Sequence, residues 1–236
     1  MNRKLLLLLM LCTTLVAQAQ VGERRNDFAI GGNAGITMNR VSFVPTIKQD
    51  WKASPTFGFS ARYICEKYFT CICGVQIEVN YANMGWKELI EDGTGNTYSH
   101  DIHYVQVPML MQLGWGRERR GAKFVFEAGP QLGYAIGTAR HKGGGAWDQS
   151  HRPNNVTHQY DNDIDRRFDY GIAAGLGMEL STAVGHFLLE GRYYYGLGDI
   201  YDNSKKGYFS RSAHGAIMVK LNYLFDIVRT KNDNIK

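Results

Sequence analysis

The sequence predicts an all-β protein, an eight-stranded antiparallel up-and-down transmembrane β-barrel. From residue 28 to residue 225, large apolar side chains alternate with Gly, Gln, Asn and Glu, and a period of two is typical of β-strands. The connections alternate between short and long, as in bacterial outer-membrane barrels. The clearest strand alternates Cys73, Val75, Ile77, Val79 and Tyr81 with Gly74, Gln76, Glu78 and Asn80.

Each expected strand is an alternating run bounded by turn residues. The eight runs are 27–38, 55–66, 72–83, 102–115, 122–136, 168–181, 185–197 and 211–225. Lengths of about 11–15 residues suffice, since a tilted spanning strand needs roughly 9–11. The expected long loops are 39–54, 84–101, 137–167 and 198–210, and the expected short turns are 67–71, 116–121 and 182–184.

Two prolines interrupt the expected strands. Pro108 lacks an N–H group, so we expect a bulge or a gap in the hydrogen-bond ladder there, and Pro130 in the next strand predicts the same.

The strand face that carries Gly, Gln, Asn and Glu distinguishes a membrane barrel from a soluble one. A solvated exterior would carry many Lys and Glu residues and few glycines, whereas this face is rich in glycine. An eight-stranded barrel has an interior just wide enough for side chains. We therefore expect a plugged lumen in which the charged residues pair. These lumen residues are Arg62, Glu78, Glu127, Glu179, Glu190, Arg192 and Lys220.

The N-terminus predicts export. Residues 1–19 have a basic start, an apolar centre and a small-x-small cleavage motif, which is typical of a signal peptide. Leu11 before Cys12 argues against a lipoprotein. We expect a short periplasmic segment at 20–26, the barrel at 27–225, a periplasmic tail at 226–236, and location in the outer membrane.

The charge balance excludes one class of partner. Without residues 1–19 the chain has about 217 residues (236 − 19), and its net charge is about +3 (27 − 2 = 25 basic, 22 acidic). So small an excess predicts no nucleic-acid partner.

Three cysteines remain after the expected cleavage. Cys65 and Cys71 flank a short turn, so a disulfide between them would bridge the hairpin, although connectivity does not follow from sequence. Cys71 and Cys73 share a strand face, which could suit a metal, but we expect no metal site there.

Aromatic residues gather near both ends of the strands. Two rings at the headgroup levels are typical of membrane barrels, although the β-propensity of aromatic residues is an alternative explanation. The ring at the loop ends comprises Tyr81, Tyr104, Tyr134, Tyr170 and Tyr195. The ring at the turn ends comprises Tyr63, Trp115, Phe124, Phe187, Tyr223 and Phe225.

The loops contain residue types used in catalysis, but no convergent site. Ser99, His100 and Asp101 are consecutive, and neighbours on an extended chain point to opposite faces. The longest loop holds several more such residues: His141, Asp148, Ser150, His151 and His158. We expect no catalytic residue and no cofactor.

A calcium site is the second possibility in this loop. Asp161, Asp163 and Asp165 have D-x-D-x-D spacing, but Arg166 and Ile172 replace the glycine and glutamate that a calcium loop requires. We expect no metal.

Four motifs give the chain a family resemblance. They are Tyr104–Leu110 (YVQVPML), Gly129–Tyr134 (GPQLGY), Phe168–Gly171 (FDYG) with Gly175–Glu179 (GLGME), and Gly191–Leu197 (GRYYYGL). In order and spacing they resemble the PorT-like outer-membrane β-barrel family of Bacteroidota. The resemblance implies an eight-stranded outer-membrane barrel and little about activity, although the family's namesake takes part in protein secretion.

The sequence favours a non-enzymatic structural or interaction role as a monomer. The alternatives are an accessory role in protein secretion, a lipid-modifying enzyme at the membrane surface, and a small-solute channel. We expect contacts with outer-membrane lipids and with other cell-envelope or secretion proteins. Basic loop residues would attract lipopolysaccharide phosphates: Arg140, Lys142, Arg152, Arg166 and Arg167.

Overall fold

The computed structural model describes residues 22–150, 152, 156–160, 162–203 and 207–230. The expected signal peptide and the end of the expected tail lie outside these residues. The long strands are β1 (Glu23–Val44), β3 (Lys52–Tyr68), β4 (Cys71–Asn83), β6 (Thr97–Gly116), β7 (Gly121–Gly143), β8 (Phe168–Thr182), β9 (Gly185–Asp199) and β10 (Arg211–Val228). Two short strands, β2 (Gln49–Asp50) and β5 (Trp86–Glu88), and the 3-10 helix η2 (His158–Tyr160) complete the described elements. None of the helices among these residues has the length and apolar character that crossing a bilayer requires.

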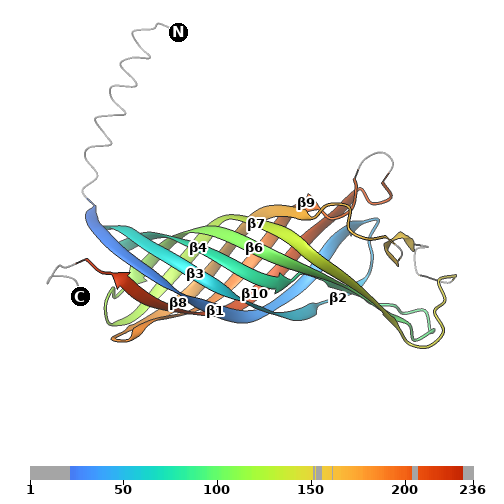
Figure 1. The fold of residues 1–236 in the computed structure, drawn as a ribbon, viewed down its shortest axis with the longest axis horizontal. Coiled ribbons are helices and arrows are strands. Elements are labelled where there is room, and N and C mark those ends of the chain that lie inside the picture. The colour runs from blue at the N-terminus through green and yellow to red at the C-terminus, as the bar shows by residue number, and fades with distance from the viewer. Residues whose placement is uncertain (1–21, 151, 153–155, 161, 204–206, 231–236) are drawn as a thin grey trace, which may run out of the picture.

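The strands close into a barrel (Figure 1). Each long strand pairs antiparallel with its neighbours in chain order, β1 pairs with β10, and the β6–β7 pairing completes the ring. Of the two remaining strands in the ten-stranded sheet, β5 pairs with the start of β6, and β2 pairs with β5. The prediction of an eight-stranded up-and-down barrel is confirmed. Closure satisfies the backbone hydrogen bonds that a bilayer would otherwise leave unpaired.

The two ends of the barrel differ (Figure 1). One end carries the start of β1, the end of β10 and the short turns, and the other carries the long connections. In bacterial outer-membrane barrels the short turns face the periplasm. We therefore call these the turn end and the loop end.

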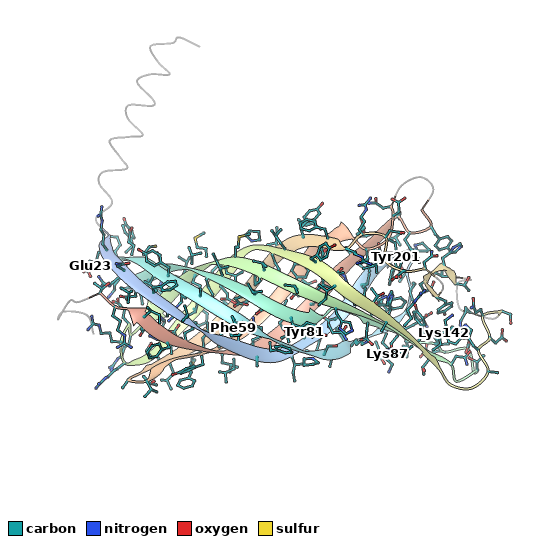
Figure 2. All side chains as sticks on the ribbon, viewed as in Figure 1. Glu23, Phe59, Tyr81, Lys87, Lys142 and Tyr201 are labelled. Atoms are coloured by element: carbon teal, nitrogen blue, oxygen red, sulfur yellow. The ribbon has the colours of Figure 1, made fainter. Side chains whose placement is uncertain are left out.

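The middle of the barrel has an apolar exterior (Figure 2). Phe59 of β3 is 78% exposed and Leu189 of β9 is 55% exposed. By contrast, Glu78 of β4 and Glu190 of β9 are each 1% exposed. The alternation therefore points its apolar face outward, which is the orientation that lipid requires.

Near the loop end the same positions still face inward, but the chemistry of the two faces is exchanged: the inward side chains are apolar and the outward ones are polar. In β1, Val41 and Phe43 are buried inside the barrel, and in β6 Tyr98 and Ile102 are buried while Ser99 and Asp101 face outward. The strands therefore continue past the apolar band as a barrel with a polar exterior and an apolar interior. The segments 39–44, 97–101 and 137–143, expected to be loop, are strand. Their polar composition reflects an exterior in water.

The two prolines coincide with a gap in one ladder. Between β6 and β7, Pro108 pairs with Gln131 and Met111 pairs with Ala128, but no pairing joins the residues between them. Pro130 lies in this gap and has no N–H group to donate. The expected interruption is present.

The three cysteines lie close together on one hairpin, β3–β4. Cys65, Cys71 and Cys73 are all free. Cys71 lies opposite Tyr68, so the register separates it from Cys65 along β3. This register does not favour the possible Cys65–Cys71 disulfide.

The barrel also extends further than 27–225 at the turn end. β1 begins at Glu23, within the expected periplasmic segment, and β10 ends at Val228, within the expected tail. Arg25 anchors the first residues, because its guanidinium pairs with Glu118 in the β6–β7 turn at 2.8 Å.

Candidate functional site

The centre of the lumen contains an ion-pair cluster built on Arg192 of β9. Its guanidinium lies 2.9 Å from Glu78 and Glu127 and 2.7 Å from Glu190. All four side chains are buried, and they come from β4, β7 and β9. One cation therefore joins three carboxylates across the barrel.

Lys220 and neighbouring amides complete this central cluster. Lys220 Nζ donates to Glu78 and lies 3.6 Å from Glu190. Gln112 donates to Glu127 at 3.1 Å, and Asn80 donates to Glu78 at 2.7 Å. Gln112 thus supplies a partner for the second oxygen of Glu127, whereas Glu190 Oε2 is buried without a hydrogen-bond partner among the described residues.

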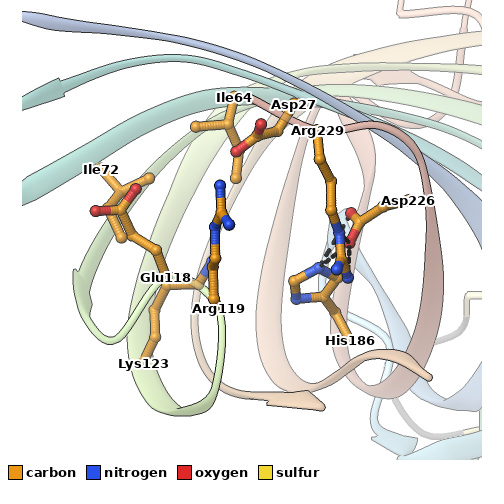
Figure 3. A pocket seen from close by; sticks show the side chains of 9 residues that line it. All are labelled: Asp27, Ile64, Ile72, Glu118, Arg119, Lys123, His186, Asp226 and Arg229. Carbon is orange, nitrogen blue, oxygen red and sulfur yellow. Dashed lines mark hydrogen bonds and ion pairs between the residues drawn. The ribbon is translucent and has the colours of Figure 1, made fainter. Parts of the chain in front are cut away.

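A second cluster lies towards the turn end, around Glu179 (Figure 3 shows the adjoining cavity). Arg62 pairs with Glu179, and Lys123 lies 3.0 Å from the same carboxylate. His186 lies 2.8 Å from Glu179 and 2.9 Å from Asp226. Each ring nitrogen of this histidine thus faces a carboxylate.

The cavity beside this cluster is small. It has a volume of about 20 Å³ and is lined by Asp27, Ile64, Ile72, Glu118, Arg119, Lys123, His186, Asp226 and Arg229. That is enough for about one water molecule. A solute larger than water finds no site here.

The structure buries all seven expected lumen residues and adds Lys123. With Lys123, four lysine and arginine side chains accompany the four glutamates in the lumen. Lys123 has the same parity as Glu127, so alternation alone places it inside. Lys123 directly follows the basic β6–β7 turn, so its charge suggests a residue of that turn and not of the lumen.

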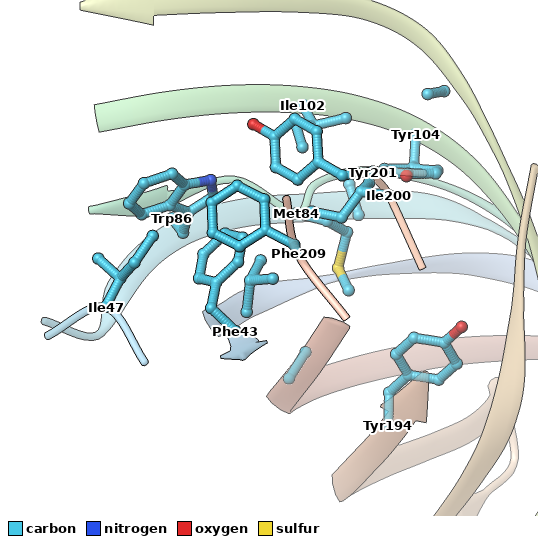
Figure 4. Packing of buried hydrophobic residues seen from close by; sticks show 14 of the residues in the cluster. Phe43, Ile47, Met84, Trp86, Ile102, Tyr104, Tyr194, Ile200, Tyr201 and Phe209 are labelled. Atoms are coloured by element: carbon cyan, nitrogen blue, oxygen red, sulfur yellow. The ribbon is translucent and has the colours of Figure 1, made fainter. Parts of the chain in front are cut away.

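Aromatic side chains close the loop end of the lumen (Figure 4). Trp86 of β5 is fully buried, and its ring lies 5.0 Å from Phe43 and 5.3 Å from Tyr98 in edge-on contacts. Phe209 lies 5.1 Å from Phe43 and 5.4 Å from Tyr201. We call this group the aromatic cap: Phe43, Trp86, Tyr98, Tyr160, Tyr201 and Phe209.

Arg152 lies against the aromatic cap and bonds to residues of the β5–β6 connection. Its guanidinium donates to Asp92 and, at 2.9 Å, to Asn96. It also lies over the rings of Trp147 and Tyr160, 4.7 and 5.6 Å from their centroids. Arg152 is 3% exposed, so, contrary to the expectation from sequence, it is not available to lipid phosphates.

Two carboxyl groups of the cap region have shifted pKa values. Burial raises the pKa of Glu88, although hydrogen bonds from Tyr160, at 3.0 Å, and Gln159 oppose this. Hydrogen bonds from Thr94 lower the pKa of Asp92 to about 2, with a further contribution from Arg152. At neutral pH, Asp92 is therefore the charged partner of Arg152.

Tyr104, expected in the aromatic ring at the loop ends, lies inside the barrel. It is 1% exposed, and its hydroxyl lies 3.2 Å from His214 Nε2. The residue falls on the Gln106 face of β6. Its aromatic character suggests a headgroup position, whereas the alternation gives the correct side.

The structure brings some of the candidate catalytic residues together: on the outer face at the loop end, His141 pairs in register with Ser99 and lies beside Asp101. His100 faces inward, whereas Asp101 faces outward and lies 3.1 Å from His141. His158 stacks on Tyr208, with ring centroids 3.9 Å apart. His151 lies outside the described residues.

No metal-ligand group forms among the residues described. No set of three His, Cys, Asp or Glu side chains in that part of the chain is placed to hold a metal ion. Asp163 accepts a hydrogen bond from Thr138, Asp165 accepts one from the Asp202 backbone, and Asp161 is not described.

The other basic loop residues have varied surroundings. Arg140 and Arg167 are exposed, Lys142 lies over the Trp147 ring, and Arg166 pairs with Asp202 at 3.5 Å.

A family model described as the outer membrane protein beta-barrel domain matches residues 17–202. The chain belongs to this family. Its outer-membrane location follows from that membership and from the barrel itself. No curated protein sequence matches the chain.

Solved structures similar to the chain are also outer-membrane barrels. Ail, the attachment invasion locus protein of Yersinia pestis, solved with the heparin analogue sucrose octasulfate, is 14% identical, with 84% of this chain and 99% of that chain covered and a TM-score of 0.39. Neisserial surface protein A is 12% identical, with coverage of 83% and 96% and a TM-score of 0.41. OprG from Pseudomonas aeruginosa is 14% identical, with coverage of 87% and 96% and a TM-score of 0.40.

Proposed function

We propose that this protein is a non-conducting, non-enzymatic outer-membrane barrel that presents a rigid extracellular surface to other cell-envelope molecules. The observation that carries the proposal is the filled lumen. Arg192 and Lys220 join Glu78 and Glu190 at the centre of the barrel, and each of these side chains is at most 2% exposed.

The aromatic cap supports the interaction role. It ties β5, the connection containing Arg152, and the segment ending at Phe209 to the barrel strands. A surface held in this way is pre-organised, which lowers the entropic cost of binding a partner.

Conductance in planar bilayers tests the closed lumen. The wild-type protein should insert without producing ion conductance above the lipid baseline. Replacing Glu127 with Ala removes one of the acidic partners of Arg192 and should produce measurable openings. Leu189→Ala, on the lipid face, is the matched control and should remain silent.

Stable conductance from the folded wild-type protein would overturn the proposal in favour of a small-solute channel. Retention of wild-type folding by each variant is checked by the difference in gel mobility between heated and unheated samples.

The interaction role has its own test. Crosslinking on intact cells, followed by purification through this protein, should recover envelope proteins or lipopolysaccharide joined to residues of the loop end. If crosslinks formed only at the turn end, or if none depended on the loop-end residues, the surface role would fail.

We also propose that the protein is a monomer, that residues 1–19 direct its export, and that it is PorT-like. The four motifs support the last assignment. Loss of surface-protein export in a deletion strain would redirect the role towards secretion. Lipid turnover abolished by His141→Ala would redirect it towards an enzyme.

A further inference from the structure

Three thiols gather on the outer face of one hairpin at the turn end. Cys71 and Cys73 open β4 on the face that carries Val75. Cys65 lies in a β-bulge of β3, between the pairs Ile64–Gly74 and Glu66–Cys73. The bulge adds one residue opposite Cys73 and directs Cys65 outward, where it is exposed.

The register selects one pair among the three. Cys65 Sγ lies 3.3 Å from the carbonyl oxygen of Cys73. Cys71 lies opposite Tyr68, three residues from Cys65, and three residues of strand span roughly 10 Å. A disulfide requires Cα atoms within about 7 Å, so Cys65 reaches Cys73 but not Cys71.

Cys71 and Cys73 are also a poor pair with each other. They are two residues apart on one strand, which separates their Cα atoms by roughly 6.7 Å, close to the upper limit for a disulfide. The two thiols lie close together, but their side chains leave the strand in the same direction, so a bond between them would require both sulfurs to bend along the strand.

The position of the cluster allows oxidation. Glu66 projects from the same outer surface beside Cys73, so this level of the barrel is not hydrocarbon. The turn end of an outer-membrane barrel faces the periplasm, and the periplasm is an oxidising compartment.

We propose that Cys65 and Cys73 become a disulfide after export, while Cys71 remains a free thiol. The oxidant is a protein dithiol–disulfide carrier of the periplasm. The thiolate of the exposed Cys65 attacks the carrier disulfide, and Cys73 then displaces the carrier from the mixed disulfide. Two electrons pass to the carrier, which leaves as a dithiol holding both protons.

Peptide mapping of the full-length protein from outer membranes tests this assignment. The unheated, folded protein is alkylated with N-ethylmaleimide without reduction and then digested with trypsin. Cleavage after Arg62, Lys67 and Lys87 separates residues 63–67, which contain Cys65, from residues 68–87, which contain Cys71 and Cys73. The two peptides should remain linked, carry one maleimide, and separate on reduction.

Two matched variants locate the bond. Cys71→Ala should keep the link and lose the maleimide, whereas Cys73→Ala should lose the link and gain alkylation at Cys65. Unlinked peptides with all three thiols alkylated would overturn the proposal, as would a link that survives in Cys73→Ala. Because alanine replaces a small side chain on an outer face, both variants should fold, and heat-dependent gel mobility verifies it.

Discussion

The middle of the barrel and its loop end enclose the same lumen with opposite chemistry. At the level of the bilayer, Glu78 and Arg192 face inward while Val79 and Leu189 face lipid. At the loop end the interior is aromatic and the exterior is polar. The solvent outside determines which face is apolar, so one strand such as β6 carries both patterns in succession.

The contrast implies two independently stabilised regions. The central cluster depends on charge compensation in a buried environment, in which losing one partner is costly. The aromatic cap depends on packing, in which the cost follows the volume removed. Substitutions in one region should therefore leave the stability of the other region unchanged. The largest loss of stability is expected for substitutions in the central cluster.

Arg192→Met should destabilise the whole barrel by about 3–5 kcal/mol, because it leaves Glu78, Glu127 and Glu190 buried without their shared cation. The measurement is the urea midpoint of the folded, fast-migrating species in lipid vesicles. Arg167→Met, at an exposed position, is the control and should unfold like wild type. An unchanged midpoint for Arg192→Met would mean that the central cluster contributes little.

Trp86→Ala should open the aromatic cap without unfolding the barrel. Removing a buried tryptophan costs about 3–5 kcal/mol, and this ring packs edge-on against Phe43 and Tyr98. The loop-end connections should become sensitive to proteinase K while the urea midpoint of the barrel is retained. Trp51→Ala, which removes a partly exposed ring, should leave protection intact. If Trp86→Ala lowered both the protease protection of the loop end and the urea midpoint of the barrel, the two regions would be one cooperative unit.

Arg152→Met should release one connection from the aromatic cap. A hydrogen bond to a charged group contributes about 1.5–3 kcal/mol, and this variant removes the one from the guanidinium to Asn96. Proteolysis should accelerate within residues 144–157 and not elsewhere. Arg166→Met removes an exposed pair and serves as the reference. Equal sensitivity of the two variants would contradict the role of Arg152.

Glu88→Gln should have the smallest effect, and the effect should depend on pH. The pKa of Glu88 is higher in the folded cap than in the unfolded chain, so the folded cap binds this proton more tightly. Protection of the cap should therefore be greatest below the ordinary glutamate pKa of about 4.3, and it should be lost as pH rises from there through the raised pKa of folded Glu88. In proteolysis measured between pH 4 and pH 7, the glutamine variant should not show this loss of protection. A decline that persists unchanged would assign the titration to another group.

Alternation alone predicts much of the barrel. It identifies the eight long strands, the outward apolar face, and the face on which Glu127 and Arg192 lie. Alternation also places Lys123 and Tyr104 correctly inside the barrel. Their residue types instead suggest a turn position for Lys123 and a headgroup position for Tyr104.

The aromatic cap could not be predicted in the same way. Segment 97–101 has a polar composition, and its inward residues Tyr98 and His100 have the parity of polar residues further along β6. Only the closed barrel shows that this part of the strand lies beyond the apolar band. The hydrogen bond from Arg152 to Asp92 joins residues 60 positions apart in the chain, which no local pattern reports.

The continuation of β6 and β7 beyond the apolar band determines how far the protein reaches. Between Val105 and Thr97 the strand spans roughly 26 Å, which is about 20 Å of height at a tilt near 40°. The outermost residues of β6 and β7 therefore stand roughly 20 Å beyond the edge of the apolar band. A molecule too large to approach the bilayer itself would still be able to contact them.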